Sequence, residues 1–434
     1  MNCRQPVVLC TAQQGATSSP QGKDNHHANS FSSKELFCYL CMHTNKPKNN
    51  LRTLLVHAGE KPDPVTGAIA PILVRTKTYK QNTFGVEARW QYSRGTNPTR
   101  TILESKLAEI EGSGQATVFS SGVAAEASFF LTLNPGDHIL FCQEVYGGTF
   151  RLLEKVMSRF GIMYDFVDFT KEKTIVKHIT PKTKYLYVET PTNPSLHMID
   201  LDLVGKISKK SKIPYVADMT FSPPCATRAF HYGAETVIHS LSKYYAGHND
   251  VIGGAVITKN EALHKHLLLM QRTLGAILSP DECYRVIQGM KTLQMRWEYV
   301  SANALQVAEY LNAHSKIKRA LYPGLKNHPG NAIAKKQMSG GYGGVLSFET
   351  RDENKTRLKK FVDCIQKRNV IIYGESLASP ESILAYPPLM SHGALPRDVR
   401  LSLGISDGFF RLSVGFEDYK DIINSMRAGL KELR

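Results

Sequence analysis

The sequence predicts an α/β fold with a mostly parallel sheet, followed by a smaller α+β domain. Between positions 96 and 290, short runs of β-branched and aromatic residues alternate with helical patterns, as in successive βαβ units. After position 290 a long helical pattern leads into glycine-rich and strand-like segments. The first 50 residues have little apolar periodicity and are rich in Ser, Asn, Gln and His, so we expect them to be disordered.

These changes in pattern divide the chain into four parts. They are a disordered extension (1–50), an N-terminal arm (51–95), an α/β domain (96–290) and an α+β domain (291–434). Met42 is an alternative start, in which case the preceding 41 residues are dispensable.

Composition and targeting signals restrict the class of protein. Hydrophobic residues make up 42% and charged residues 21%, which excludes a largely disordered or collagen-like chain. The net charge of +16 is spread along the chain without a nucleic-acid-binding motif, so we expect no nucleic-acid partner. There is no apolar run of about 18 residues and no secretory apolar core, so we expect a cytoplasmic protein without a membrane partner.

The eight cysteines do not form the pattern of a disulfide framework, and we expect free thiols in a reducing compartment. Cys38-x-x-Cys41 with His43 resembles half of a zinc site, but no second ligand pair has suitable spacing. We therefore expect no metal.

Apolar spacing and capping residues define the elements of the α/β part. A helix is expected over 97–111, because Asn97 or Thr99 can cap it, Pro98 stands early and Gly112 ends it. The other expected helices are 123–133, 150–160 and 201–210. The expected strands are 117–119, 138–142, 163–167, 185–188, 215–217 and 236–239.

The later part is predicted by the same criteria. Its expected helices are 297–313, 358–367 and 419–433, and its expected strands are 345–348 and 410–414. The glycine-rich run from Gly340 to Gly344 lacks the Lys-Ser/Thr of a phosphate-binding loop, so it does not indicate a nucleotide site.

Polar side chains follow two of the expected strands. Asp218 ends the strand 215–217, and Ser240, Ser242 and Lys243 come directly after the strand 236–239. The carboxyl ends of parallel strands are where α/β folds bind ligands. A Lys for a Schiff base, hydroxyls for a phosphate and an Asp for a ring nitrogen are the groups that pyridoxal phosphate needs. Taken alone, Asp218 is as well explained as a turn former.

Further motifs occur in order along the chain. They are Tyr92-Ser93-Arg94, Asn97-Pro98-Thr99, Ser121-Gly122, Tyr146-Gly147-Gly148-Thr149, Glu189-Thr190-Pro191-Thr192-Asn193-Pro194, Gly247-His248, Glu375-Ser376-Leu377 and Arg411-Leu412-Ser413-Val414-Gly415. With these motifs, residues 51–434 resemble the pyridoxal-phosphate enzymes of cysteine and methionine metabolism. The resemblance implies an aspartate-aminotransferase-like (fold type I) structure and a homotetramer built from dimers.

The same resemblance assigns roles around the cofactor ring. Lys243 would form the Schiff base and carry the proton of the substrate α-carbon. Asp218 would keep the ring nitrogen protonated, with Thr220 beside it, and Tyr146 would stack on the ring and act near the leaving group.

For the phosphate, the resemblance implies backbone N–H groups of Gly122 and Val123 at a helix start, and hydroxyls of Ser240 and Ser242. Tyr92 and Arg94 would reach the phosphate from the arm of the neighbouring subunit.

For the substrate, Arg411 would hold the α-carboxylate, assisted by Asn193 and Ser376. Glu375 and Arg151 would lie near its distal end.

The reaction is predicted less sharply than the cofactor. Glu375 and Arg151 match the γ-type enzymes, and Gly148 stands where methionine γ-lyases place Cys. Cystathionine γ-lyase, which releases cysteine, 2-oxobutanoate and ammonia, is therefore the first expectation. Cystathionine γ-synthase follows, then cystathionine β-lyase or methionine γ-lyase, and outside enzymes a catalytically dead binding protein on the same fold.

Overall fold

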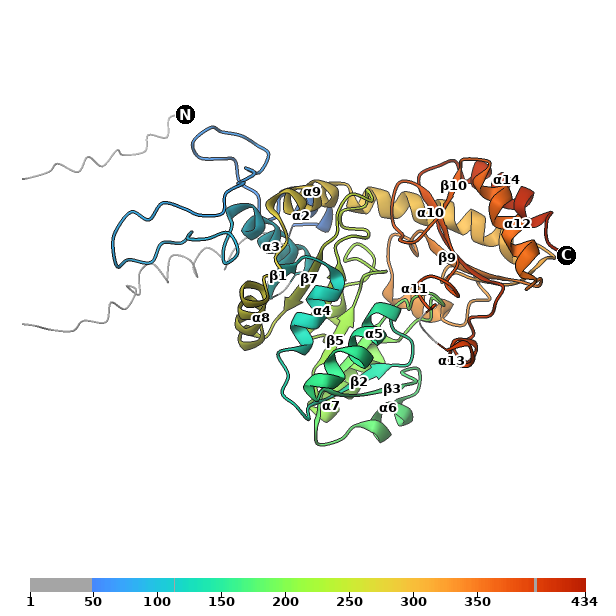
Figure 1. The fold of residues 1–434 in the computed structure, drawn as a ribbon, viewed down its shortest axis with the longest axis horizontal. Helices are drawn as coiled ribbons and strands as arrows, with labels where there is room; N and C mark the ends of the chain where they lie inside the picture. The colour runs from blue at the N-terminus through green and yellow to red at the C-terminus, as the bar shows by residue number, and fades with distance from the viewer. Residues whose placement is uncertain (1–48, 113, 394–395) are drawn as a thin grey trace, which may run out of the picture. The chain divides into compact units, whose positions relative to one another are not determined.

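The computed structural model describes residues 49–434 except 113 and 394–395. The Cys38-x-x-Cys41 pattern and Met42 lie outside this part of the chain. Two β-sheets, each with its own helices, make up the described fold (Figure 1).

The larger sheet is mostly parallel, as predicted. Its order is β1-β7-β6-β5-β4-β2-β3, and only β7 runs antiparallel to its two neighbours. The strands are β1 (Gln115–Phe119), β2 (His138–Cys142), β3 (Met163–Val167), β4 (Thr183–Glu189), β5 (Tyr215–Asp218), β6 (Thr236–Ser240) and β7 (Gly254–Thr258). Every residue of β2 and β5 is buried, because helices cover both faces of such a sheet.

Helices connect and cover these strands (Figure 1). They are α2 (Leu51–His57), α3 (Pro98–Glu111), α4 (Gly122–Phe130), α5 (Gly147–Lys155), α6 (Glu172–His178), α7 (Leu201–Ser211), α8 (Glu261–Leu274) and α9 (Pro280–Lys291), with 3₁₀ turns at Met157–Phe160 and Ala229–Tyr232. Asn97 caps α3 as predicted, because its side chain accepts hydrogen bonds from the Thr99 and Arg100 N–H groups.

Five helix predictions need correction at their ends. In the later part of the chain, the helix expected over 297–313 starts at Leu293, that over 358–367 runs from Lys355 to Gln366, and that over 419–433 ends at Leu430. The other two lie beside the larger sheet. The helix expected over 150–160 starts at Gly147 and ends at Lys155, because Val156 leaves the helical conformation and a 3₁₀ turn follows. Gly147 and Gly148 weaken the intrinsic helix signal, so a start there is hidden in the sequence. The helix expected over 123–133 ends at Phe130.

Strand β7 and helices α2, α6, α8 and α9 were not predicted, since short apolar runs do not distinguish a buried strand from a buried helix. In the later part, the strands at 317–321, 371–373 and 382–385 and the helices at 331–337 and 397–402 were not predicted either.

The second sheet has the order β10-β11-β12-β9-β8. Its strands are β8 (Ile317–Leu321), β9 (Val345–Thr350), β10 (Ile371–Tyr373), β11 (Ser382–Ala385) and β12 (Phe409–Ser413). Its helices are α10 (Leu293–Ala313), α11 (Asn331–Gln337), α12 (Lys355–Gln366), α13 (Arg397–Ser402) and α14 (Tyr419–Leu430). Helices α12 and α14 pack on each other beside this sheet (Figure 1).

Helix α10 belongs to both halves of the fold. Leu293, Trp297 and Val300 in its first part pack in the core of the larger sheet. Val307 and Leu311 in its second part pack in the core of the smaller sheet. One uninterrupted helix therefore connects the two cores.

Among the described residues, no helix is long and apolar enough to cross a membrane. The cysteines of this part, Cys142, Cys225, Cys283 and Cys364, are free, in agreement with the predicted thiols.

A buried ion pair joins the start of the described chain to α3. Lys106 is fully buried, and its Nζ lies 2.8 Å from Glu60 Oε1. The second carboxylate oxygen of Glu60 lies 2.8 Å from Lys291 Nζ on α9. Burial lowers the pKa of Lys106, while the Glu60 carboxylate opposes that shift.

We predict that Lys106→Ala lowers the free energy of unfolding by about 3 kcal/mol, because it removes a buried side chain and one of the two cations that contact the Glu60 carboxylate, Lys291 being the other. Urea denaturation followed by circular dichroism measures the change. The matched control is Lys265→Ala, which breaks an exposed pair with Glu261 on α8 and should change stability little. Equal effects of the two substitutions would contradict the structural role of the buried pair.

Candidate active site at the carboxyl ends of the strands

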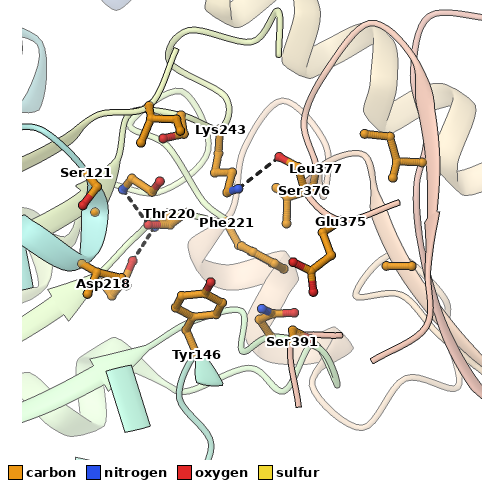
Figure 2. A pocket seen from close by; sticks show the side chains of 18 of the residues that line it. Ser121, Tyr146, Asp218, Thr220, Phe221, Lys243, Glu375, Ser376, Leu377 and Ser391 are labelled. Carbon is orange, nitrogen blue, oxygen red and sulfur yellow. Dashed lines mark hydrogen bonds between the residues drawn. The ribbon is translucent and has the colours of Figure 1, made fainter. Parts of the chain in front are cut away.

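A cavity of about 650 Å³ lies where β4, β5 and β6 end (Figure 2). It contains most of the residues predicted for the site. These are Gly122, Val123, Tyr146, Asn193, Asp218, Thr220, Ser240, Ser242, Lys243, Glu375, Ser376 and Arg411. The parallel topology brings together the residues from Gly122 to Lys243, and Glu375, Ser376 and Arg411 are added from the part of the chain that contains the second sheet.

Lys243 follows the end of β6 and points into the cavity (Figure 2). Its Nζ donates a hydrogen bond to Ser376 Oγ at 3.1 Å. Burial, followed by the positive charge of Arg411, lowers the pKa of Lys243 to about 8, and the Glu375 carboxylate opposes this shift. A substantial fraction of this amine is thus neutral near pH 8, the form that attacks a carbonyl group.

Asp218 is the last residue of β5 and is buried. One of its oxygens accepts the N–H of Thr220 at 2.9 Å, and Thr220 Oγ1 accepts the N–H of Ser240 at 2.9 Å. Burial raises the pKa of Asp218, while its hydrogen bonds with Thr220 oppose the shift. Within the described chain no Lys or Arg forms an ion pair with Asp218. The protonated ring nitrogen of a pyridoxal phosphate would supply the missing positive charge.

The start of α4 provides donors for an anion. Ser121 caps the helix by accepting the Ala124 N–H at 3.0 Å. The N–H groups of Gly122 and Val123 have no acceptor in the described part of the chain, as is usual at a helix start. A Cβ at position 122 would lie 3.0 Å from the Cβ of Ser240, so glycine permits this close approach.

Ser242 is placed at the same end of the cavity. Its hydroxyl accepts the N–H of Gly253 at 3.0 Å and donates to the Gly253 carbonyl at 3.3 Å. Its hydroxyl is therefore already bonded to the backbone, whereas Ser240 faces α4. The donors at the start of α4 and Asp218, which forms no ion pair with a Lys or Arg of the described chain, fit the phosphate and the ring nitrogen of pyridoxal phosphate.

Arg411, on β12, is buried at the opposite side of the cavity. Its Nη1 donates to Asn193 Oδ1 at 2.8 Å and its Nη2 donates to the Ser376 carbonyl at 2.9 Å. Its Nε is buried and has no acceptor among the described residues, so it is available to a carboxylate. Burial lowers the pKa of Arg411 to about 10, which still leaves a cation at neutral pH.

Ser376 has a φ of 92°, which is costly for a residue with a side chain. Arg411 holds its carbonyl and Lys243 bonds its hydroxyl, so both contacts maintain this conformation. Backbone strain of this kind is common where a side chain must be aimed at a ligand.

Tyr146 and Glu375 project into the cavity from different sides (Figure 2). Burial, followed by the Glu375 carboxylate, raises the pKa of Tyr146. A Cβ at position 148 would lie 2.4 Å from the Tyr146 ring, so the ring position depends on Gly148.

Three predicted site residues lie outside the cavity of this chain. Arg94 donates through Nη1 to the Arg272 carbonyl at 2.7 Å, and its guanidinium carbon lies 5.6 Å from the centre of the Tyr92 ring. Arg151 is exposed on α5. Its positive charge lowers the pKa of Tyr146 and so opposes the larger effect of burial.

The cavity also contains acidic residues that sequence reasoning missed. Glu126 on α4 and Glu189 at the end of β4 are both buried in its lining. The signal for Glu126 was an isolated acidic residue in an otherwise apolar helix. Glu189 begins the motif Glu189-Thr190-Pro191-Thr192-Asn193-Pro194, in which only Asn193 has a predicted role. In the described residues no cluster of His, Cys, Asp and Glu is suited to hold a metal.

Known proteins are similar to this chain in sequence and in fold. The family model described as Cys/Met metabolism PLP-dependent enzyme matches residues 52–431. A cystathionine beta-lyase of Coxiella burnetii is 41% identical over 389 residues, which are 89% of this chain and 99% of that protein. A cystathionine gamma-lyase of Bacillus subtilis is 38% identical over 382 residues, 88% of this chain and 99% of the relative.

A crystal structure of cystathionine gamma synthase from Xanthomonas oryzae is also similar. Its TM-score is 0.85 with 34% identity, and the match covers 89% of this chain and 99% of the other. The similarity confirms the predicted aspartate-aminotransferase-like fold.

We predict that Lys243 is the most reactive lysine of the cofactor-free protein near pH 8. About half of its amine is neutral there, whereas an ordinary lysine with a pKa near 10.4 is almost fully protonated. Acylation at a series of pH values, followed by peptide mass spectrometry, gives the midpoint, with exposed Lys265 as the internal control.

The variant Arg411→Gln should move this midpoint to higher pH, because it removes a positive charge that lowers the Lys243 pKa. A wild-type midpoint as high as that of Lys265 would contradict the prediction.

Proposed function

Because the chain belongs to the Cys/Met-metabolism family of pyridoxal-phosphate-dependent enzymes, with their fold type I architecture, we propose that it is a cystathionine γ-lyase. The reaction would convert cystathionine to cysteine, 2-oxobutanoate and ammonia. Its relatives include a cystathionine beta-lyase, a cystathionine gamma-lyase and a cystathionine gamma-synthase, which are all transsulfuration enzymes acting on sulfur amino acids.

The observation that carries the proposal is the position of Glu375. Its carboxylate shares one cavity with the Arg411 guanidinium, and both change the pKa of Lys243 and Tyr146. Cystathionine has an amino-acid group at each end. Arg411 would bind the carboxylate of the reacting end and Glu375 the ammonium of the distal end. The resemblance of Glu375-Ser376-Leu377 to γ-type enzymes supports cleavage on the γ side.

Pyridoxal phosphate, when bound, supplies an electron-withdrawing ring that stabilises negative charge at the substrate α-carbon. Asp218 would hold positive charge on the ring nitrogen, which makes this withdrawal stronger. Gly122, Val123 and Ser240 would fix the phosphate at the start of α4.

Lys243 would be the proton carrier. Its neutral amine, which donates a hydrogen bond to Ser376 in this structure, would accept the α-proton of the substrate. After losing that proton to solvent, the amine would be neutral again and would accept the β-proton. Tyr146, whose raised pKa keeps its hydroxyl protonated, would donate a proton to the departing sulfur. Arg411 would hold the α-carboxylate fixed during both transfers.

A β-lyase is the second candidate, because a relative at 41% identity has that name. A γ-synthase is the third, on the similarity to the Xanthomonas oryzae structure. All three would use the same Lys243, Asp218 and Arg411, so they differ in the bond broken and in the second substrate.

Product analysis distinguishes these activities. With cystathionine alone we expect cysteine and 2-oxobutanoate, whereas β-cleavage gives homocysteine and pyruvate, which chromatography separates. O-Succinylhomoserine with cysteine tests for net synthesis of cystathionine. Lys243→Ala is the control and should be inactive. Homocysteine and pyruvate as the main products would replace the γ-lyase proposal by β-lyase.

We further propose that Tyr92 and Arg94 complete the site of a neighbouring subunit in a homotetramer built from dimers. Both stand on the arm outside this chain's own cavity, and the guanidinium of Arg94 is suited to a phosphate.

We expect inactive Arg94→Ala and inactive Lys243→Ala subunits to regain partial activity when mixed under conditions that allow exchange. Some mixed dimers then contain one site with both residues intact. Activity is measured against each variant mixed with itself, and exchange is checked by mass spectrometry of differently tagged subunits. If subunits exchange and no activity returns, Arg94 does not act across an interface.

A further inference from the structure

Three buried carboxyl groups line one side of the cavity. They belong to Glu126 on α4, Glu189 at the end of β4 and Asp218 at the end of β5. The exposed fractions of these residues are 3%, 4% and 8%. Like charges in a desolvated site oppose each other's ionisation, and the Asp218 charge raises the pKa of both glutamates. The cluster therefore does not carry three full negative charges at neutral pH without a compensating cation.

Glu126 and Glu189 have different hydrogen-bond partners. Glu189 accepts two backbone N–H groups, from Tyr146 at 2.7 Å and Asn193 at 2.9 Å. Burial, followed by the Asp218 charge, raises the pKa of Glu189 as well, and these two hydrogen bonds oppose the shift. Glu126 accepts only hydroxyl groups, from Thr149 at 2.7 Å and Tyr187 at 2.8 Å, and both bonds go to Oε1.

The second oxygen of Glu126 is buried and has no partner in the described chain. A carboxylate in this position would leave a desolvated anionic oxygen, whereas a carboxylic acid places an O–H there. Burial, followed by the Asp218 charge, raises the pKa of Glu126 to about 8. Geometry and charge thus favour the same neutral form.

The groups that face Glu126 are on three elements. Strand β4 presents Tyr187 and Glu189, strand β5 presents Asp218, and α5 presents Thr149 and, at its start, Tyr146. Of these, only Asp218 has a role toward the cofactor ring nitrogen. His239 on β6 lowers the pKa of Asp218, and it is paired with Glu111 at 2.6 Å.

We propose that Glu126 is a positioning residue that sets the charge of Asp218: it is protonated in the cofactor-free protein and releases this proton when the ring binds. The O–H bond of Glu126 breaks, the electron pair stays on the carboxylate, and the proton leaves to solvent. The positive ring nitrogen at Asp218 compensates the new negative charge. The proposal rests on the role assigned to Asp218, and it does not depend on which bond of the substrate is cleaved.

The test measures protons released on cofactor binding, without substrate. Calorimetric titration of the cofactor-free protein with pyridoxal phosphate, in buffers of different ionisation enthalpy, gives the net proton count. Near pH 7 we expect wild type to release up to one proton more per site than Glu126→Gln. The difference should vanish near pH 10, where Glu126 is already ionised before binding.

Two controls separate this effect from others. Glu104→Gln removes another carboxyl group whose pKa burial raises, but it is outside the cavity and should give the wild-type proton count. Glu126→Gln keeps a carbonyl oxygen for the Thr149 and Tyr187 hydroxyls, so it should retain the fold, which circular dichroism checks. Tyr187→Phe is a second probe and should move the proton release to higher pH, because it removes a hydrogen bond that lowers the Glu126 pKa.

Equal proton counts for wild type and Glu126→Gln from pH 6 to pH 10 would overturn the proposal. Asp218→Asn identifies the partner. This variant lacks the charge that raises the Glu126 pKa, so Glu126 is more ionised before binding and fewer protons should be released near pH 7 than in wild type. Release equal to that of wild type would show that Asp218 does not set the charge of Glu126, and the proposed coupling fails. A wrong assignment of γ-cleavage leaves all these counts unchanged, so the failures are distinguishable.

Discussion

The arrangement of the site depends on the Arg411 guanidinium. This one group contacts Asn193 beyond the end of β4 and the carbonyl of Ser376, so it connects the second sheet with the first. Ser376 in turn accepts the hydrogen bond of Lys243. The position of the amine is therefore linked, through two hydrogen bonds, to the cation proposed to bind the substrate carboxylate. The positive charge of Arg411 also lowers the Lys243 pKa, so one residue affects both geometry and reactivity.

Much of the site could be predicted because parallel strands place their carboxyl ends at one edge. Asp218, Ser240 and Lys243 follow two such strands, and Gly122 opens the helix that approaches them. The strands 138–142 and 163–167 were predicted with their observed bounds, since each is a compact apolar or alternating run between turn signals. The roles of these residues came from resemblance, and composition alone did not provide them.

What the sequence did not predict depends on tertiary contacts. Strand β7 is antiparallel between two neighbours, and its pairing is not visible in a five-residue apolar run. The start of α5 is hidden by Gly147 and Gly148, which have low helix propensity. A Cβ at position 147 would collide with the Ser391 carbonyl and one at position 148 with the Tyr146 ring, so tertiary packing requires both glycines. The state of Glu126 depends on Tyr187 and Asp218, which are distant in sequence, so an isolated Glu in a helix did not reveal its environment.

The helix α10 has a consequence for how such chains can be recombined. It is 21 residues long, contains no Gly or Pro, and its apolar residues are divided between the two cores. A crossover in this helix, or at position 290, would join half of one core to a foreign partner. Chimeric proteins that exchange C-terminal parts between homologues would therefore keep α10 with both sets of its contacts from one parent. A joint in the loop after Ala313 does not avoid this problem, because Val307 and Leu311 before it pack in the core of the second sheet.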